Sequence, residues 1–349
     1  MTSLPPVNQD YLLDSLVDLL RIPSPTGFTD QAIHFIQMKL EAFSGISISR
    51  TRKGALIAKC PGEMTDSPRA ITAHTDTLGA MVKEIKSNGR LKLTRIGGLI
   101  WNTVETEGCT VFTQSARTVR GSLMVNKASA HVHGKDVVET KREEENMEVR
   151  LDARTKSDSE TRSLGIEVGD FVAFDPRVEV NNGFVRSRFL DDKACVACIL
   201  AAVKALYEAS LKPTRTTYLH ISNYEEVGHG AAAGIPPEVT ELLVVDMAAI
   251  GEGQNSDEFH ASLCAKDSGG PYHRELSQQL LQLAKIYNIP NNVDTYPYYR
   301  SDGEAFWSAG GDVAVALIGP GVDASHNYER THVDALLATT QWVVAYLLS

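Results

Sequence analysis

The second half of the chain alternates between helical and extended apolar segments, and this alternation most constrains its fold. Apolar residues recur at helical spacing over 194–207, 274–287 and 335–348, while apolar runs of strand length lie at 216–221, 242–245 and 313–318. Helices that alternate with buried strands are typical of an α/β sheet that carries helices on both faces. We therefore predict an α/β fold with a helix-covered sheet.

The amino-terminal segment continues this pattern. A helix is predicted over 10–20, and a second helix begins at Thr29 or Asp30, either of which can cap its first turn. Strand-like runs follow at 46–50, 55–60 and 70–73.

Residues 85–182 have a different character. Short extended runs lie among glycines and polar turns, at 91–96, 110–113, 121–125 and 171–174. This spacing is typical of a small β-barrel or sandwich. The charged stretch 135–150 predicts a solvated loop or surface strand. The sequence thus indicates one discontinuous α/β domain, 1–84 with 183–349, interrupted by a β-rich insert at 85–182.

Charge and cysteine content exclude several classes of protein. The chain has 34 basic and 44 acidic residues, a net charge of −10, which disfavours binding to nucleic acid or to an anionic membrane. No apolar stretch approaches the roughly 18–20 residues that cross a bilayer, and no basic region precedes an apolar run at the amino terminus. Five cysteines in a chain of 349 residues predict a reducing, cytoplasmic location.

Histidine and acidic residues follow the predicted strands in turn. His74 and Asp76 come after one strand, Glu225 and Glu226 after a second, and Asp246 after a third. His326 follows a fourth strand, and the pair Asp191 and Asp192 precedes the apolar helix at 194–207. Ligands of open α/β sheets bind at the carboxyl ends of the strands, so we expect these side chains to share one crevice.

Two imidazoles and three carboxylates suit a centre that holds two metal ions. Imidazole nitrogen and carboxylate oxygen bind zinc, cobalt or manganese, and two such ions can share a carboxylate and a water. One carboxylate must stay free of the ions to accept a proton from that water. Glu225 and Glu226 can supply one base and one ligand, because Gly228 and Gly230 indicate a loop in which adjacent side chains can face one site.

Five stretches together resemble the M42 family of dinuclear metallo-aminopeptidases, also called glutamyl or deblocking aminopeptidases. They are AHTDTLG (73–79), LDDKA (190–194), YEEVG (224–228), VVDMA (244–248) and SHNYE (325–329), with GIEVGDFVAFDP (165–176) as a sixth. Further stretches resemble M42-like hydrolases that are often encoded beside genes for an N-acetylglutaminylglutamine amide osmoprotectant. These are GQNSDE (253–258), DSGGPY (267–272), YYRSD (298–302) and DASHNYERTH (323–332).

The resemblance implies a role for each matching residue. His74, Asp191 and Asp246 would hold one ion, and Asp191, Glu226 and His326 the other, with zinc expected and cobalt or manganese as alternatives. Glu225 would be the general base. Asp76 would hydrogen-bond the His74 imidazole, and the Asp191–Asp192 peptide bond would be cis.

The same resemblance implies a zinc-peptidase-like mixed sheet and a homo-oligomer. Dimers would form through the insert at 85–182, and six dimers can enclose a tetrahedral dodecamer that admits short peptides. The expected activity is removal of amino-terminal residues from short peptides, with Glu225 taking a proton from a bridging water. A related amidase or deacylase for a small dedicated substrate stays open, and so does a metal-free glycosidase with two carboxylates.

Several other residues allow two interpretations. Cys195 and Cys198 have the spacing of a redox or zinc pair, but their apolar surroundings favour buried core thiols. His131 and His133 are predicted to be exposed, with a place at the rim of the active site as the alternative. Arg300 is either part of a surface loop or a group that binds a substrate carboxylate. His220, His229 and His332 are predicted to be structural or supporting residues.

Overall fold

The computed structural model describes residues 3–349, and the chain folds into two compact units. One unit runs up to Asp76 and resumes at Arg177–Ser349, and the other is Thr77–Pro176. These boundaries lie a few residues before the predicted ones. The reason is strand pairing: β4 (Gly79–Ile85) pairs with strands of the second unit, and β10 (Glu179–Asn181) with a strand of the first.

A mixed sheet forms the centre of the first unit. Its strand order is β1-β2-β12-β3-β13-β17-β15-β16, with β14 paired to β17. The strands are β1 (Ser47–Arg50), β2 (Leu56–Cys60), β3 (Met64–His74), β12 (Arg215–Ser222), β13 (Glu241–Val245), β14 (Ala248–Ala249), β15 (Ala261–Lys266), β16 (Asn291–Thr295) and β17 (Ala314–Val322). A small sheet contains β10, β11 (Phe184–Ser187) and β18 (Glu329–His332).

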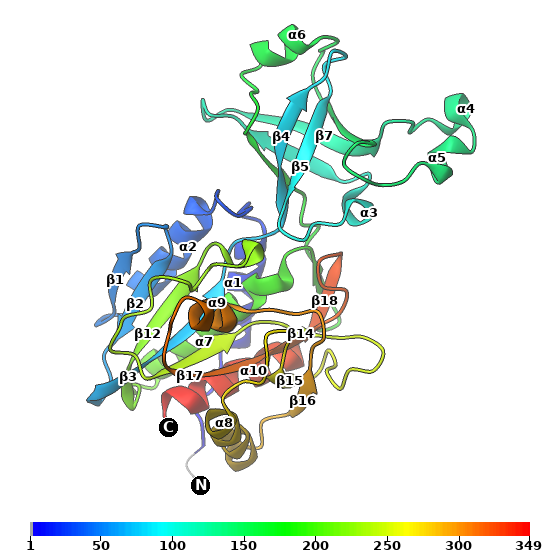
Figure 1. Ribbon diagram of the computed structural model, residues 1–349. Coiled ribbons are helices and arrows are strands. Elements are labelled where there is room, and N and C mark those ends of the chain that lie inside the picture. The colour runs from blue at the N-terminus through cyan, green and yellow to red at the C-terminus, as the bar shows by residue number, and fades with distance from the viewer. Residues whose placement is uncertain (1–2) are drawn as a thin grey trace. The chain divides into compact units, whose positions relative to one another are not determined.

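Helices flank this sheet (Figure 1). They are α1 (Gln9–Leu20), α2 (Asp30–Glu41), α7 (Leu190–Glu208), α8 (Arg274–Tyr287), α9 (Asp302–Ser308) and α10 (Val333–Leu347). The predicted helices and strands of this unit are present, with ends shifted by a few residues. The sequence patterns did not reveal the short helix α9 or the strands β10, β11, β14, β15, β16 and β18.

Alternating side chains of the central strands face two hydrophobic cores. Leu243 and Val245 of β13 pack in a core with α2, α7, α8 and α10, whereas Leu242 and Val244 pack in another, against which Trp307 of α9 lies. Successive side chains of a strand point to opposite faces, so a strand buried on both faces is apolar throughout. The predicted α/β sheet with helices on both faces is therefore confirmed.

Helix α7 is buried along most of its length. It packs against α1 and α10, and its side chains from Leu190 to Val203 are all buried. Cys195 and Cys198 lie inside this segment as free thiols, so the interpretation as core residues is confirmed. Burial raises the pKa of the Cys198 thiol to about 12, so this sulfur is protonated near neutral pH.

The second unit is a closed barrel, in the order β4-β5-β8-β7-β6-β9. Its remaining elements are β5 (Leu91–Ile96), β6 (Gly108–Phe112), β7 (Thr118–Val125), β8 (Met147–Leu151), β9 (Phe171–Phe174), α3 (Trp101–Val104), α4 (Ala130–His133), α5 (Asp136–Glu139) and α6 (Asp158–Ser163). Of the two predicted alternatives, the barrel is therefore correct.

The charged stretch 135–150 is only partly the solvated segment that its composition predicts. Its last residues enter the barrel as β8, where Met147, Glu148 and Val149 are buried. Glu148 lies within hydrogen-bonding distance of Lys86 and Arg90. The high charge of the stretch predicts solvent exposure. The buried carboxylate of this barrel strand is nevertheless stable, because it is paired with two basic side chains. Across residues 3–349, no helix is both long and apolar enough to cross a membrane.

Arg69 of β3 holds the carboxyl-terminal end of α10. Its buried guanidinium donates to the carbonyl oxygens of Tyr346, at 2.5 Å, and Ser349, at 2.6 Å, and lies 4.4 Å from the centre of the Tyr346 ring. A cation at this end of a helix interacts favourably with the helix dipole.

We expect Arg69→Met to destabilise the first unit by about 2–3 kcal/mol, because it removes two hydrogen bonds that a buried charged group donates to the end of α10. The measurement is the free energy of unfolding in urea. Arg50→Met is the control, since Arg50 is partly exposed and bonds Gln37 on the surface. Equal stabilities for the two variants would show that Arg69 does not anchor α10.

Candidate metal centre

The candidate site lies at one edge of the central sheet. Strands β12, β3, β13 and β17 run parallel, so their carboxyl ends meet at this edge. His74 is the last residue of β3, and Asp246 follows the last residue of β13 directly. Asp191 lies at the start of α7, where its backbone is not yet helical, and the Asp191–Asp192 peptide bond is cis.

His74, Asp191 and Asp246 form the first candidate donor group. All three residues are buried, and one potential ligand atom of each lies within 4.8 Å of the others. The Nε2 atom of His74 is 3.1 Å from Oδ1 of Asp191. Its Nδ1 atom is 2.9 Å from the backbone oxygen of Asp76, which leaves Nε2 facing the carboxylates.

Asp191, Glu226 and His326 form the second candidate donor group, again with ligand atoms within 4.8 Å of one another. The Nε2 atom of His326 lies 3.6 Å from Oδ2 of Asp191 and 3.6 Å from Oε2 of Glu226. Asp191 therefore offers one oxygen to each group. The structure thus brings together all five residues that the sequence assigns to a metal centre.

The charges of this cluster indicate which ligands it suits. Burial, together with Asp191, raises the pKa of Glu226 well above its usual range, and burial raises the pKa of Asp246 to about 7. Burial acts to lower the pKa of His74, but hydrogen bonds with Asp191 and Asp76 leave it well above its usual value. Such a cluster is short of positive charge, which cations held by these nitrogen and oxygen atoms would supply. The donor set fits zinc-type ions.

Glu225 lies beside both groups and belongs to neither. Its Oε2 atom is 3.7 Å from Nε2 of His74. Burial raises the pKa of Glu225 well above its usual range. The nearby His74 acts to lower this pKa, and Asp246 acts to raise it further. Glu225 and Glu226 occupy a single 3₁₀ turn that ends at Gly228, whose φ is 85°. As predicted, this is a loop, and it lets adjacent glutamates face one site.

Asp76 contacts the His74 imidazole, as predicted, and also has a role that the sequence did not indicate. The His74 ring contacts the backbone oxygen of Asp76, whereas the nearest carboxylate oxygen is 3.6 Å away. The carboxylate instead accepts from the backbone N–H groups of Glu225, at 3.2 Å, and Glu226, at 3.3 Å, and from Thr26 Oγ1, at 2.7 Å. Asp76 therefore holds the loop that carries the two glutamates.

Two buried acidic residues near the site were not assigned a role from the sequence. Asp302, the first residue of α9, accepts from Ala231 N, at 2.7 Å, and from the Ser222 hydroxyl. Glu329 accepts from the backbone of Asp191 and His326. Both lie in stretches that carry the family resemblance, YYRSD and SHNYE, but spacing alone does not distinguish a residue that binds backbone from one that binds a ligand.

Three further histidines of the first unit have partners outside the two donor groups, and two more lie in the second unit. His220 is buried against Thr72, and burial lowers its pKa to about 3. His229 stacks on Tyr224, and His332 caps α10. His131 and His133 are exposed on α4 in the second unit.

Arg300 lines a cavity of about 310 Å³ that also includes Glu225, Ser301 and Glu304. Its side chain is 73% exposed, and its Nε atom donates to Glu304 at 3.0 Å. The residue is therefore both on the surface and beside the candidate base, and its pairing with a substrate stays a prediction.

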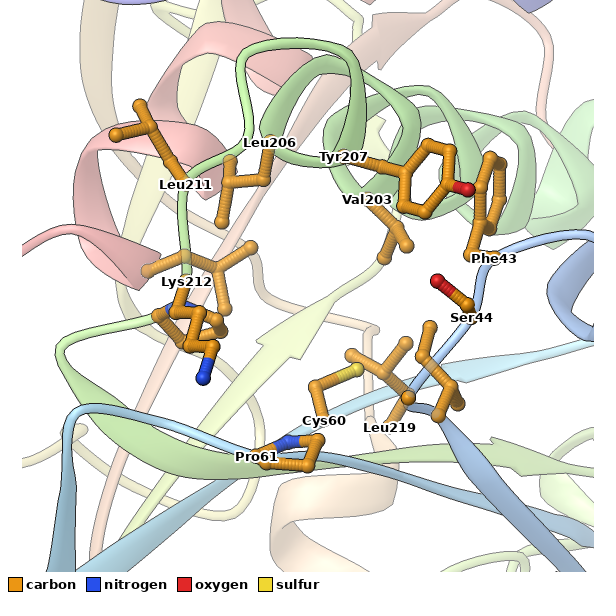
Figure 2. Close-up of a pocket in the computed structure, with 14 residues that line it drawn as sticks. Phe43, Ser44, Cys60, Pro61, Val203, Leu206, Tyr207, Leu211, Lys212 and Leu219 are labelled. Carbon is orange, nitrogen blue, oxygen red and sulfur yellow. The ribbon is translucent and has the colours of Figure 1, made fainter.

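An apolar pocket at the far end of α7 is separate from this centre. Figure 2 shows its lining, which includes Phe43, Cys60, Val203 and Leu206. Val203 lies twelve residues beyond Asp191, and a rise of 1.5 Å per residue puts about 18 Å between them. The pocket has no donor set like that of the sheet edge.

Comparisons with known proteins give one family. The model of the M42 glutamyl aminopeptidase family matches residues 54–341. The YhfE protein of Bacillus subtilis (strain 168), an aminopeptidase by name, is 46% identical over 338 residues, which cover 97% of each chain.

Two solved structures share the fold. An aminopeptidase of the archaeon Desulfurococcus kamchatkensis has a TM-score of 0.86 and 21% identity, covering 97% of this chain and 95% of its own. The Pyrococcus horikoshii TET1 peptidase, which can assemble into a tetrahedron or a large octahedral shell, has a TM-score of 0.84 and 19% identity, covering 97% and 99%. On the family match and the Bacillus relative together, this chain belongs to the M42 family of aminopeptidases and is a peptidase.

Proposed function

We propose that this chain is a dinuclear metal-dependent aminopeptidase that removes amino-terminal residues from short peptides. One observation carries the proposal: two donor groups share Asp191, and a further carboxylate, Glu225, lies beside them without belonging to either. Two ions about 3.5–4 Å apart that share one carboxylate are typical of hydrolytic two-metal sites. We propose zinc as the metal, because imidazole and carboxylate donors suit it.

Glu225 is the proposed general base. A pair of divalent cations would supply Lewis acidity for the scissile carbonyl and lower the pKa of an attacking water. Glu225 would accept the proton of that water at Oε2 and return it to the leaving amine. Its position beside the donor groups suits this task, because a general base must lie within reach of the proton that it accepts.

The loop that carries Glu225 is fixed through its backbone. Asp76 accepts hydrogen bonds from the first two residues of the turn, and Asp302 accepts one from Ala231, just beyond it. Lys53 adds a contact with the backbone oxygen of Gly230, at 3.2 Å. These anchors hold the carboxylate at one position, which a general base requires for proton transfer over hydrogen-bond distance.

Arg300 is proposed to bind a substrate carboxylate. Glu304 holds the Nε edge of its guanidinium, which leaves the two terminal nitrogens to form a paired contact with a carboxylate in the cavity beside Glu225. The carboxylate could belong to an acidic amino-terminal residue or to the carboxyl terminus of a dipeptide.

We further propose that the chain forms a homo-oligomer, with the barrel at Thr77–Pro176 as its dimerisation unit. Support comes from the structural likeness to TET1, whose subunits can assemble into closed shells. A cytoplasmic location is proposed because all five cysteines are free and buried, which fits a reducing compartment.

The first experiment is a substrate panel with zinc-loaded protein. We expect hydrolysis of aminoacyl anilides and short peptides with a free amino terminus, and complete loss of activity after treatment with a chelator. The panel also contains the same peptides with an acetylated terminus and a set of aryl glycosides. A preference for acylated substrates would replace the proposal with an amidase or deacylase, and chelator-resistant cleavage of glycosides would replace it with a glycosidase.

Glu225→Gln should lower kcat by about 10³-fold and leave the metal content unchanged, because the amide cannot accept the proton yet Glu225 belongs to neither donor group. Turnover and bound zinc are measured on the same preparation. Glu226→Gln is the matched comparison, and it should lower the metal content. Near-normal turnover in Glu225→Gln would rule out Glu225 as the base.

Arg300→Gln should lower kcat/KM for a substrate that carries the recognised carboxylate by about 5- to 10-fold, a modest effect because the guanidinium is exposed. One comparison uses glutamyl against glutaminyl anilide, and the other uses Ala-Ala against its carboxyl-terminal amide. Within each pair, we compare the kcat/KM of the substrate that carries the carboxylate with that of the substrate that lacks it. The pair for which Arg300→Gln abolishes the difference identifies the source of the carboxylate. Arg50→Gln, a surface control, should change neither, and unchanged ratios in Arg300→Gln would exclude the contact.

A further inference from the structure

Glu329 is a buried acidic residue that belongs to neither donor group. It is the first residue of β18, it is 2% exposed, and its backbone is paired with Ser187 of β11. A carboxylate so thoroughly buried must have partners that replace water. Its partners identify its role.

Both oxygens of Glu329 accept hydrogen bonds from the backbone of candidate ligands. Oε2 accepts from the N–H of Asp191 at 3.1 Å, and Oε1 accepts from the N–H of His326 at 3.0 Å. Asp191 and His326 lie far apart in the sequence, on different elements. One side chain therefore connects the two segments that contribute to the second donor group.

His326 needs such an anchor. Its φ is 62°, in the left-handed region that non-glycine residues adopt at a cost in free energy. The residue lies between β17 and β18, is only partly buried, and its imidazole must meet Asp191 and Glu226. The hydrogen bond from its N–H to Glu329 stabilises the backbone conformation that directs the ring to these carboxylates.

We propose that Glu329 is a positioning residue that sets the affinity of the second donor group, Asp191, Glu226 and His326, for its cation. This inference rests on the proposed two-metal centre. Glu329 would not touch the cation. It would hold the backbones of two ligands so that their side chains converge before the cation binds, and ordering them in advance strengthens binding.

The chemistry of the contact makes glutamine the informative replacement. Both backbone partners are donors, so both side-chain atoms must be acceptors. Glu329→Gln keeps the size of the side chain but turns its NH₂ group toward one of the two N–H groups, so that one hydrogen bond is lost.

The hairpin that carries Glu329 has other anchors. The backbones of Asp323 and Arg330 are joined by two hydrogen bonds, of 2.8 and 3.1 Å, and Thr331 Oγ1 donates to Gly321 O at 2.7 Å. The hairpin should therefore stay folded in Glu329→Gln. Arg330→Gln is a matched control, because it breaks an exposed ion pair with Glu258 next to Glu329 and leaves the site untouched.

The test is isothermal titration calorimetry, in which zinc is added to the metal-free, full-length protein. We expect wild type and Arg330→Gln to bind two zinc ions. Glu329→Gln should bind the second ion about 10- to 100-fold more weakly and affect the first ion, which shares only Asp191, by much less. The melting temperature of the metal-free protein should fall by only about 2–4 °C, the cost of one buried hydrogen bond. The kcat of Glu329→Gln should recover at high zinc concentration, because Glu329 does not contact substrate.

Two results would overturn the inference. One is equal affinity of Glu329→Gln and wild type for the second ion, and the other is an equal loss of both ions with a larger fall in melting temperature, which indicates a general structural role. If the wild-type protein itself fails to bind a pair of ions, the proposed function is wrong at an earlier step. The two failures are therefore distinguishable.

Discussion

The structure depends on burying several carboxylates within a few ångströms of one another. Asp191 stands between two imidazoles, with Glu225, Glu226 and Asp246 around it. Like charges in a low dielectric repel, and taking each carboxylate out of water adds a further cost in free energy. Divalent cations bound among them would remove much of this cost. Before cations bind, the rest of the fold must hold these carboxylates close together.

Two features of the fold provide this support. Parallel strands at the centre of the sheet end at a common edge, and side chains packed on both faces keep those ends from moving apart. At the edge itself, acidic residues outside the donor groups bind backbone N–H groups: Asp76 and Asp302 hold the loop after β12. Backbone contacts of this kind fix where a loop runs and leave its functional side chains free for ligands.

The fold persists among relatives whose sequences have diverged. The Desulfurococcus aminopeptidase keeps the fold along nearly the whole chain at 21% identity, whereas the Bacillus relative shares 46%. Packing tolerates exchange of one apolar residue for another of similar volume. A buried acidic residue that accepts two backbone hydrogen bonds has few substitutes, because its replacement must present two acceptors at the same positions.

Sequence by itself determined the class of fold and the set of candidate residues. Strands that are apolar on both faces, such as β13, and the apolar helix α7 predict a sheet covered by helices. Polar residues that follow parallel strands must then meet at one edge of that sheet. It did not determine how those residues are used. Tertiary structure decided that the Asp76 carboxylate also holds the glutamate loop. It decided that β8 is a barrel strand despite its charges, and that Asp302 and Glu329 belong to the site at all. Each of these depends on hydrogen bonds between segments far apart in the chain, which no local pattern of residues encodes.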